Sequence, residues 1–464
     1  MEPHLSCIVA EEKTVCTKKV AATAQQCKKQ KFSSKLVDDM ANATLNTRQQ
    51  KLFDYLTQTK SFSPVFISGS AGTGKSALLV ALREHWLAED KIVFVTAYTH
   101  LAARNINGKT CHSLFRFDFD LNLLRAQIGV PHYVIIDEIS MVPEKMLDGI
   151  DSRLRQNSGK FSLPFGGVNV VVFGDLYQIP PVDKHRQLLP PYKSDIWHSF
   201  ELYELTENMR QSEPEFIANL NMLRVGNVKC IPYFNGFVVD AATQNIEDSV
   251  GCTSLVSTHK EANDLNLKCY TYIGAAADDD IEGGEKKEEL VCVVKRSHGR
   301  WTKDMIVFNE EQAQLIFGES IRVCVGARMM ITHTTDSFCN GDLGVVQSFT
   351  DKEIVIVREH DNKIGVLRQK CLTFNTKTPG VVTFLTGFPI AYGWAVTIHK
   401  AQGMTMKHLT VYPACIFAPG QAYVALSRVV HSSGLKLATP IARNALCNMN
   451  YIQEVYDYMK PLNV

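Results

Sequence analysis

The stretch VFISGSAGTGKSALLVALREHW, residues 65–86, decides the fold of this chain. It opens on VFIS, a continuous apolar run that is typical of a buried strand in a parallel sheet. It closes on a segment in which Leu78, Leu82 and Trp86 recur at helical spacing. Between them, residues 69–76 fit G-x-x-x-x-G-K-S/T, whose glycines let backbone amide groups surround phosphate oxygens at a helix N-terminus. We therefore predict a strand, a phosphate-binding loop and a helix, in this order.

This loop supplies candidate nucleotide ligands. Lys75 is expected to neutralise the β and γ phosphates of a nucleotide, and the Ser76 hydroxyl is expected to coordinate Mg²⁺. A glycine-rich turn without a ligand is the alternative, but a position between a strand and a helix is the one that phosphate binding requires. The predicted nucleotide-binding residues of the loop are Gly69, Gly72, Thr73, Gly74, Lys75 and Ser76.

Further apolar runs indicate a parallel sheet. IVFVTA (92–97), YVIIDE (133–138) and VNVVVFGD (168–175) alternate with helix-like segments, which is typical of a sheet covered on both faces. The second run ends in Asp137 and Glu138. In an ATPase the first acid supports Mg²⁺, and the second can orient and deprotonate the attacking water. Acids at a strand end are weak evidence alone, but their position downstream of a phosphate loop strengthens it.

Two later loops carry a glutamine and an arginine. In FGDLYQIPPV, residues 173–182, two prolines stiffen the chain, so Gln178 is suited to sensing a γ-phosphate. In LTENMRQ, residues 205–211, Arg210 could stabilise transition-state charge as arginine fingers do. Without their context, an ordinary proline-terminated loop and a solvated surface arginine are the simpler interpretations.

Two segments near the C-terminus combine charge with apolar neighbours. AVTIHKAQGMT, residues 395–405, offers Thr397, His399 and Lys400 for phosphate or hydroxyl contacts. A structural histidine is the alternative for His399. GQAYVALSRV, residues 420–429, leaves Arg428 as a charge among apolar residues, which indicates an anionic partner.

Composition excludes several classes of protein. Of 464 residues, 45% are hydrophobic and 21% are charged, which is ordinary for globular domains. Lys and Arg number 49 against 48 for Asp and Glu, so a nucleic-acid partner would need a local basic groove. The 13 cysteines contain no CxxC pair, which argues against a zinc ribbon or a disulfide scaffold. No apolar stretch is long enough to span a membrane.

The N-terminal region differs from the rest of the chain. Residues 1–44 are rich in Lys, Ala and Gln without a sustained apolar period, and we expect a flexible tail. The acids near its start argue against a secretory or transit signal. We therefore expect an intracellular protein, in the nucleus rather than the mitochondrion. Much further along, residues 336–392 contain short alternating runs separated by turn residues, which predict a small β domain.

The motifs occur in a known order. The phosphate loop, the DE strand, GDLYQIPP, MRQ, TIHKAQG and YVALSR together resemble superfamily-one helicases of the Pif type (petite integration frequency) and their RecD- and Dda-like relatives. The resemblance covers Leu45 to Leu437. It implies an α/β fold with two RecA-like parallel-sheet domains, residues 45–205 and residues 206–335 plus 393–464. It also implies that residues 336–392 are a small β-barrel insertion in the second domain.

The same resemblance assigns roles to single residues. Gln49 resembles the glutamine that reads adenine, and Gln178 resembles the γ-phosphate sensor. Arg210 and Arg428 resemble paired fingers that the second domain donates. One departure is His100, which stands where the family has glycine. The residues that match DNA-contacting motifs are Thr96, Thr99, His112, Thr397, His399 and Lys400.

The function that the resemblance implies is that of an ATP-dependent DNA helicase moving five-prime to three-prime, in genome replication, recombination or repair. ATP and Mg²⁺ are the expected cofactors. Single-stranded and duplex DNA are the expected partners, with no membrane partner, and the chain is expected to be monomeric. Its compact size is compatible with a viral member of the family. Two alternatives are an ATP-switched nucleic-acid-binding protein that remodels without processive unwinding, and an RNA translocase.

Overall fold

The computed structural model describes residues 44–118, 120–182, 188–239, 246–275, 288–300, 307–308, 316–317, 320–375 and 380–464. The predicted tail, residues 1–44, lies outside the described residues except for its last residue. The chain divides into two compact units. Unit 1 comprises the residues up to Asn227 together with Cys447–Val464, and unit 2 comprises Val228–Leu446. Within the described ranges, no helix is long and apolar enough to cross a membrane.

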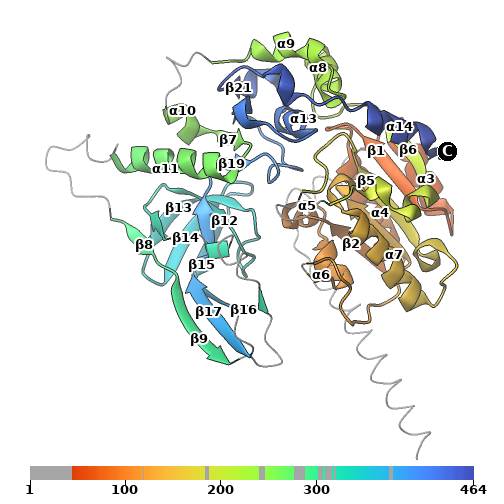
Figure 1. Ribbon diagram of the computed structural model, residues 1–464, viewed down its shortest axis with the longest axis horizontal. Coiled ribbons are helices and arrows are strands. Elements are labelled where there is room, and N and C mark those ends of the chain that lie inside the picture. The colour runs from red at the N-terminus through yellow and green to blue at the C-terminus, as the bar shows by residue number, and fades with distance from the viewer. Residues whose placement is uncertain are drawn as a thin grey trace, which may run out of the picture. The chain divides into compact units, whose positions relative to one another are not determined.

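Unit 1 is built on a seven-stranded parallel sheet with the order β22-β6-β1-β5-β4-β2-β3 (Figure 1). The apolar runs predicted as strands form β1, β2, β4 and β5, and each is buried along its whole length. Burial on both faces is the reason that these runs are continuously apolar. The strands are β1 (Val65–Gly69), β2 (Val93–Ala97), β3 (Lys109–Thr110), β4 (Tyr133–Asp137), β5 (Asn169–Gly174), β6 (Glu201–Leu205) and β22 (Lys460–Pro461).

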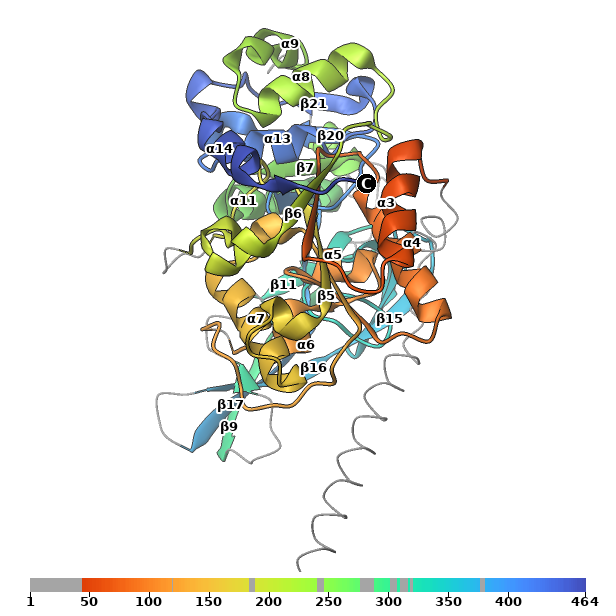
Figure 2. The same cartoon turned by 90° about the vertical axis from the view of Figure 1, so that its right-hand side faces the viewer.

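Helices cover both faces of this sheet. Phe66 and Val134 pack on one face with apolar residues of α7 and α14, whereas Ile67 and Ile135 pack on the other with those of α3 and α4. This alternation follows from the two-residue period of a strand. Figure 2 shows the two pairs of helices on opposite sides of the sheet. The helices are α3 (Thr47–Gln58), α4 (Lys75–Ala88), α5 (His100–Asn105), α6 (Cys111–Phe115), α7 (Glu144–Ser158), α8 (Pro214–Arg224) and α14 (Asn450–Tyr458), with short 3-10 helices η1 (Ile139–Met141), η2 (Pro164–Gly167), η3 (Pro191–Lys193) and η4 (Asp195–Ser199).

Unit 2 contains a second parallel sheet, of four strands in the order β19-β7-β20-β21. Its strands are β7 (Thr253–Val256), β19 (Ala395–Thr397), β20 (Leu409–Val411) and β21 (Leu435–Leu437). Its helices are α9 (Ile231–Asn235), α10 (Ile246–Gly251), α11 (His259–Ala275) and α13 (Gln421–Leu426), with η5 (Val228–Cys230), η6 (Pro413–Cys415), η7 (Ser432–Gly434) and η8 (Arg443–Ala445).

A mainly antiparallel β region interrupts unit 2. It has a five-stranded sheet, β15-β14-β13-β12-β18, a four-stranded sheet, β10-β16-β17-β9, and the pair β11-β8. The region begins before the predicted insertion at 336–392, because β8, β9, β11 and β12 precede residue 336. Its strands are β8 (Leu290–Cys292), β9 (Lys295–Arg300), β10 (Val307–Phe308), β11 (Ile321–Val323), β12 (Arg328–Ile331), β13 (Leu343–Phe349), β14 (Glu353–Arg358), β15 (Ile364–Arg368), β16 (Lys370–Asn375), β17 (Val381–Gly387) and β18 (Ile390–Tyr392).

The α/β class is as predicted, but the division of the chain differs from the predicted boundaries. Unit 1 continues past residue 205 to Asn227, and the segment Cys447–Val464, expected in the second domain, belongs to unit 1. The reason is strand pairing: Lys460 of β22 lies in register with Glu201 of β6, so the C-terminal segment completes an edge of the first sheet.

Candidate active site

The phosphate loop joins β1 to α4, and its glycines are required by its backbone. Gly72 and Gly74 have φ angles of +89° and +75°, which other residues rarely adopt. A Cβ atom on Gly74 would lie 2.4 Å from Nε2 of Gln49, so only glycine permits this approach. Thr73 is buried, and its hydroxyl donates to the carbonyl oxygen of Ser70 at 2.9 Å.

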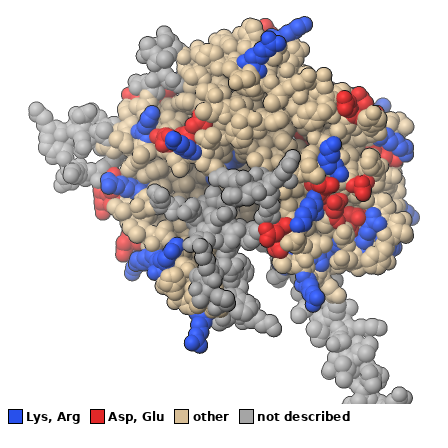
Figure 3. Space-filling view, viewed as in Figure 1, with Lys and Arg blue, Asp and Glu red and all other residues tan. Residues whose placement is uncertain are grey.

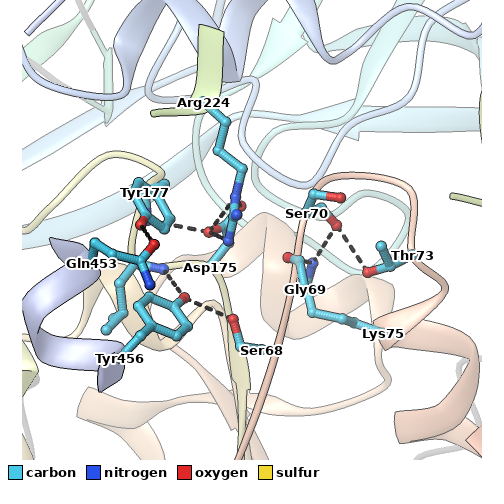
Figure 4. A network of polar contacts seen from close by, with 11 residues as sticks. Ser68, Gly69, Ser70, Thr73, Lys75, Asp175, Tyr177, Arg224, Gln453 and Tyr456 are labelled. Carbon is cyan, nitrogen blue, oxygen red and sulfur yellow. Dashed lines mark hydrogen bonds and ion pairs between the residues drawn. The ribbon is translucent and has the colours of Figure 1, made fainter. Parts of the chain in front are cut away.

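Lys75 lies within this loop. Its Nζ donates to the carbonyl oxygens of Gly69 and Ser70 at 2.7 and 3.0 Å (Figure 4). Burial lowers the pKa of Lys75, while the negative charges of Asp175 and Glu138 oppose that shift. The ammonium group therefore lies among acids at the carboxyl edge of the sheet, which is where open parallel sheets bind their ligands.

The two acids of the DE motif follow β4. Burial, and then the charge of Glu138, raises the pKa of Asp137, whose Oδ1 accepts a hydrogen bond from the Glu138 backbone N–H at 2.9 Å. Glu138 has φ 50° and ψ 49°, a left-handed conformation that costs a residue with a side chain about 1–3 kcal/mol. Backbone strain of this kind concentrates at functional sites.

The oxygen ligands present suit Mg²⁺. Asp137 offers a carboxylate, and Ser76, in the first turn of α4, offers a hydroxyl. Mg²⁺ is commonly held by one or two such ligands together with substrate phosphates and water, and not by a cage of protein groups alone. No cluster of three or more His, Cys, Asp or Glu residues suited to a metal occurs in the described part of the chain.

Gln178 lies on the loop after β5. Its backbone N–H donates to the carbonyl oxygen of Asp175 at 3.0 Å, and its side chain is buried. Its Oε1 atom is also buried and has no hydrogen-bond partner within the ranges that the structure describes. A buried acceptor without a partner is costly, and a ligand or a water molecule that donates a hydrogen bond would satisfy it.

Arg210 belongs to unit 1, so the prediction that the second domain donates it is wrong. The backbone N–H of Met209 donates to the Gly72 carbonyl oxygen at 2.7 Å. The Asn208 side chain accepts from Arg210 N at 2.9 Å and donates to the Ala71 carbonyl oxygen at 3.4 Å. These bonds hold Arg210 beside the phosphate loop of its own unit.

Gln49 is fully buried beneath the phosphate loop. Its Oε1 accepts from the backbone N–H of Asn46 at 2.9 Å, and its Nε2 donates to the Thr73 and Gly74 carbonyl oxygens at 3.1 and 3.4 Å. Both ends of the amide are thus bound to protein groups, so Gln49 supports the loop in this conformation. Recognition of adenine by Gln49 stays a prediction.

Arg428 lies in unit 2 and is buried. Its guanidinium donates to the carbonyl oxygen of Val424 at 2.7 Å, to the hydroxyl of Ser427 at 2.9 Å and to the carbonyl oxygen of Met404 at 3.4 Å. These acceptors fix the orientation of the side chain within unit 2. Its role as an arginine finger stays a prediction.

Three of the predicted DNA contacts are buried or bound to protein groups. Thr96 is fully buried and donates to the carbonyl oxygen of Lys109 at 2.7 Å, so the prediction of a DNA contact is wrong for this side chain. Thr99 caps α5, accepting from the backbone N–H of Ala102 at 3.2 Å. Thr397 ends β19 and is 5% exposed.

The other three are half-buried or exposed. His112 is half-buried, 5.7 Å from the Tyr98 ring, and burial lowers its pKa. Lys400 is exposed. His399 stacks on Phe417, a ring that is 60% exposed, with the ring centroids 6.1 Å apart. Sequence reasoning missed Phe417, because nothing local pairs it with His399.

Sequence reasoning also missed a buried ion pair at the start of the loop that carries Gln178. Asp175 is fully buried, and both its carboxylate oxygens accept from Arg224 of α8, with the shortest distance 2.8 Å (Figure 4). Asp175 stands in the GDLYQIPP motif, so the signal was present there. Arg224 lies 49 residues away and carries no local signal.

Charge on the visible surface is mixed. On the face drawn in Figure 3, Lys and Arg side chains lie among Asp and Glu side chains over the described surface. This agrees with the formal net charge of +1. A nucleic-acid partner would therefore be bound by local groups, and not by a field of one sign.

Comparison with known proteins agrees with the motif order. A family model described as PIF1-like helicase matches residues 44–229. The chain is 26% identical to the ATP-dependent DNA helicase Pif1 of Campylobacter jejuni, over 83% of this chain and 91% of that protein. It is 30% identical to the ATP-dependent DNA helicase PIF1 of Danio rerio, over 80% of this chain but only 58% of that protein.

Solved structures give the same result. The Pif1 helicase from Bacteroides in complex with ADP-AlF3 and single-stranded DNA matches with a TM-score of 0.71 and 25% identity, covering 90% of this chain and 97% of that chain. The likeness therefore spans both units of this chain. By its motifs, its parallel sheet and these relatives, the chain belongs to the PIF1-like helicases.

Proposed function

We propose that this chain is an ATP-dependent DNA helicase that moves five-prime to three-prime on single-stranded DNA and unwinds duplex DNA. The observation that supports it most is the convergence of Lys75, Asp137 and Glu138 at one edge of the sheet in unit 1, where the acids act on the pKa of Lys75. A phosphate-binding cation, a metal-binding acid and a base are the parts that ATP hydrolysis needs.

The residues divide the chemistry among them. Phosphate oxygens would replace the loop carbonyls as acceptors for Lys75, while Glu138 would accept a proton from the attacking water. Mg²⁺ held by Ser76 and Asp137 would neutralise phosphate charge. The Oε1 of Gln178, which has no hydrogen-bond partner among the described residues, would accept a hydrogen bond from the same water. Arg210 and Arg428 would stabilise charge in the transition state.

The coupling to DNA involves residues of both units. His112 in unit 1, and His399 and Lys400 in unit 2, would contact the strand. Binding and hydrolysis of ATP would change the DNA affinity of the two units in turn, which moves the protein along one strand. We propose that a monomer performs this cycle, which light scattering on the DNA-bound protein would test.

The test is the steady-state ATPase rate with no nucleic acid, with single-stranded DNA and with RNA of matched sequence. We expect stimulation by DNA, and strand separation from duplexes with a five-prime overhang but not from those with a three-prime overhang. Stimulation without strand separation would favour an ATP-switched remodelling protein. Stimulation by RNA alone would favour an RNA translocase. Equal rates in all three conditions would contradict all three functions.

A further inference from the structure

The C-terminal helix α14 contacts two of the three strand ends that lead to predicted ATPase residues, those of β1 and β5. Tyr456, near the end of this helix, is 6% exposed and lies in the core against the sheet of unit 1. Its hydroxyl lies 2.7 Å from Oγ of Ser68 and accepts a hydrogen bond from the backbone N–H of Leu176 at 3.3 Å (Figure 4). One oxygen atom therefore joins β1 to the loop after β5.

Both partners are adjacent in sequence to residues of the site. Ser68 precedes Gly69, whose carbonyl oxygen accepts from Lys75 at 2.7 Å. Leu176 lies in the turn that carries Gln178, which is closed by the hydrogen bond from Gln178 N to the Asp175 carbonyl oxygen at 3.0 Å. The hydroxyl of Tyr456 thus ties the start of the phosphate loop to the start of the loop that positions Gln178.

Other contacts hold the Tyr456 ring in place. Its ring stacks on that of Tyr177, with centroids 5.6 Å apart and planes 19° apart. The Tyr177 hydroxyl donates to Gln453, one turn earlier in α14, at 2.8 Å. On Tyr177 lies the guanidinium of Arg224, 4.2 Å from the ring centroid, which also pairs with Asp175. The helix is therefore attached to the Gln178 loop through Tyr456 and Gln453, while Arg224 of α8 packs on the other face of this contact through Tyr177.

A packing role alone accounts for the ring of Tyr456 but not for the position of its hydroxyl. Ser68 is fully buried, so removal of the hydroxyl leaves a buried serine and a buried amide with one partner fewer. Burial also raises the pKa of Tyr456, which keeps the hydroxyl protonated and able to donate. Interior groups are close-packed, so the two loops would shift to find new partners.

We propose that Tyr456 is a positioning residue for ATP hydrolysis: its hydroxyl sets the spacing between the phosphate loop and the loop of Gln178. The C-terminal segment is then a part of the ATPase machinery of unit 1. This inference rests on the proposed ATPase function. It concerns the alignment of the attacking water with the γ-phosphate, and not the affinity for ATP or for DNA.

The experiment compares Tyr456→Phe with Tyr458→Phe in the full chain. Tyr458 lies in the same helix and is 89% exposed, so its variant is the matched control. We expect kcat for ATP at saturating single-stranded DNA to fall about tenfold in Tyr456→Phe, because misplacement of well under 1 Å is costly in an aligned site. The KM for ATP should stay within about twofold, and Tyr458→Phe should match the wild type.

A second variant separates positioning from folding. Ser68→Ala removes the other side of the same hydrogen bond, so the loss of kcat in the double variant should equal that in Tyr456→Phe alone, and not the product of the two losses. Thermal unfolding should show each variant folded at the assay temperature.

The outcomes that would overturn the inference are distinct. An unchanged kcat in Tyr456→Phe, a loss shared by Tyr458→Phe, or multiplicative losses in the double variant would reject the positioning role while leaving the ATPase function intact. A wild-type chain without DNA-stimulated hydrolysis would reject both.

Discussion

The strands of the two parallel sheets of this protein lead to different sets of side chains. In unit 1, β1 leads to Lys75, β4 leads to Asp137 and Glu138, and β5 leads to Asp175. In unit 2, β7 ends at Val256, β20 at Val411 and β21 at Leu437, and β19 leads to His399 and Lys400. Arg428 of unit 2 is bound to the oxygens of its own unit.

The difference shows that a parallel sheet by itself does not make a hydrolytic site. Burial of charged groups is expensive unless the charges are paired. In unit 1 the acids oppose the lowered pKa of Lys75, and Asp175 is paired with Arg224. We therefore assign hydrolysis to unit 1 and expect unit 2 to contribute DNA contacts and one charge.

Lys75→Ala is expected to have the largest effect on ATP hydrolysis, and it tests whether the phosphate loop of unit 1 is the hydrolytic site. Phosphate charge would then lack its buried cation, and we expect kcat to fall by about a thousandfold or more, as for the loss of a phosphoryl-transfer cation. The steady-state ATPase assay with single-stranded DNA measures this. The control is Lys51→Ala, since Lys51 is an exposed lysine of α3 in the same unit. More than a tenth of wild-type turnover would show that the loop of unit 1 is not the site.

Glu138→Gln tests the base without changing the size of the side chain. An amide cannot accept the proton of the attacking water, so we expect kcat to fall by about 10²–10⁴. Binding of ATP should persist, because the phosphate loop is untouched. Filter binding of labelled ATP, together with single-turnover hydrolysis, separates the two effects. Loss of ATP binding would place Glu138 in the nucleotide pocket itself, and unchanged hydrolysis would exclude it as the base.

Arg224→Met tests the buried ion pair of unit 1. Asp175 is fully buried and would keep a charge without its partner, which costs about 3–5 kcal/mol of unfolding free energy for a buried pair. We expect a loss of unfolding free energy at the lower end of this range, because the Arg224 side chain is 17% exposed. Urea unfolding followed by Trp fluorescence measures it. The double variant with Asp175→Asn should recover part of the lost unfolding free energy. A loss below about 1 kcal/mol in Arg224→Met would show that the pair contributes no more than a solvent-exposed ion pair does.

The comparison also shows what the sequence could predict. Strands β1, β2, β4 and β5 were predicted because strands buried on both faces are continuously apolar. The phosphate loop was predicted because its glycines and lysine are adjacent in the chain. These signals are local, and they account for the sheet of unit 1 and for the charged residues at its edge.

Contacts between distant segments had no such signal. The pairing of β22 with β6 brings together Lys460 and Glu201, which are 259 positions apart. No sequence motif predicts this pairing. Thr96 was misjudged for a related reason: a hydroxyl at a strand end can face a ligand or a neighbouring strand. Only the pairing of β2 with β3 decides that it faces the carbonyl oxygen of Lys109.

The smallest expected effect tests the role of unit 2. Lys400 is exposed, and if it contacts a DNA phosphate, Lys400→Ala should weaken single-stranded DNA binding by about 1 kcal/mol, the scale of a solvent-exposed ion pair. In a plot of the logarithm of the DNA association constant against the logarithm of the salt concentration, the magnitude of the slope should decrease by about 0.7, the value for one phosphate of a single strand. Lys268→Ala on α11, another exposed lysine of unit 2, should change neither quantity. Weaker binding with an unchanged slope would mean that Lys400 does not contact a DNA phosphate. Its substitution would then weaken binding by changing the conformation of the turn, and other residues would contact the phosphates.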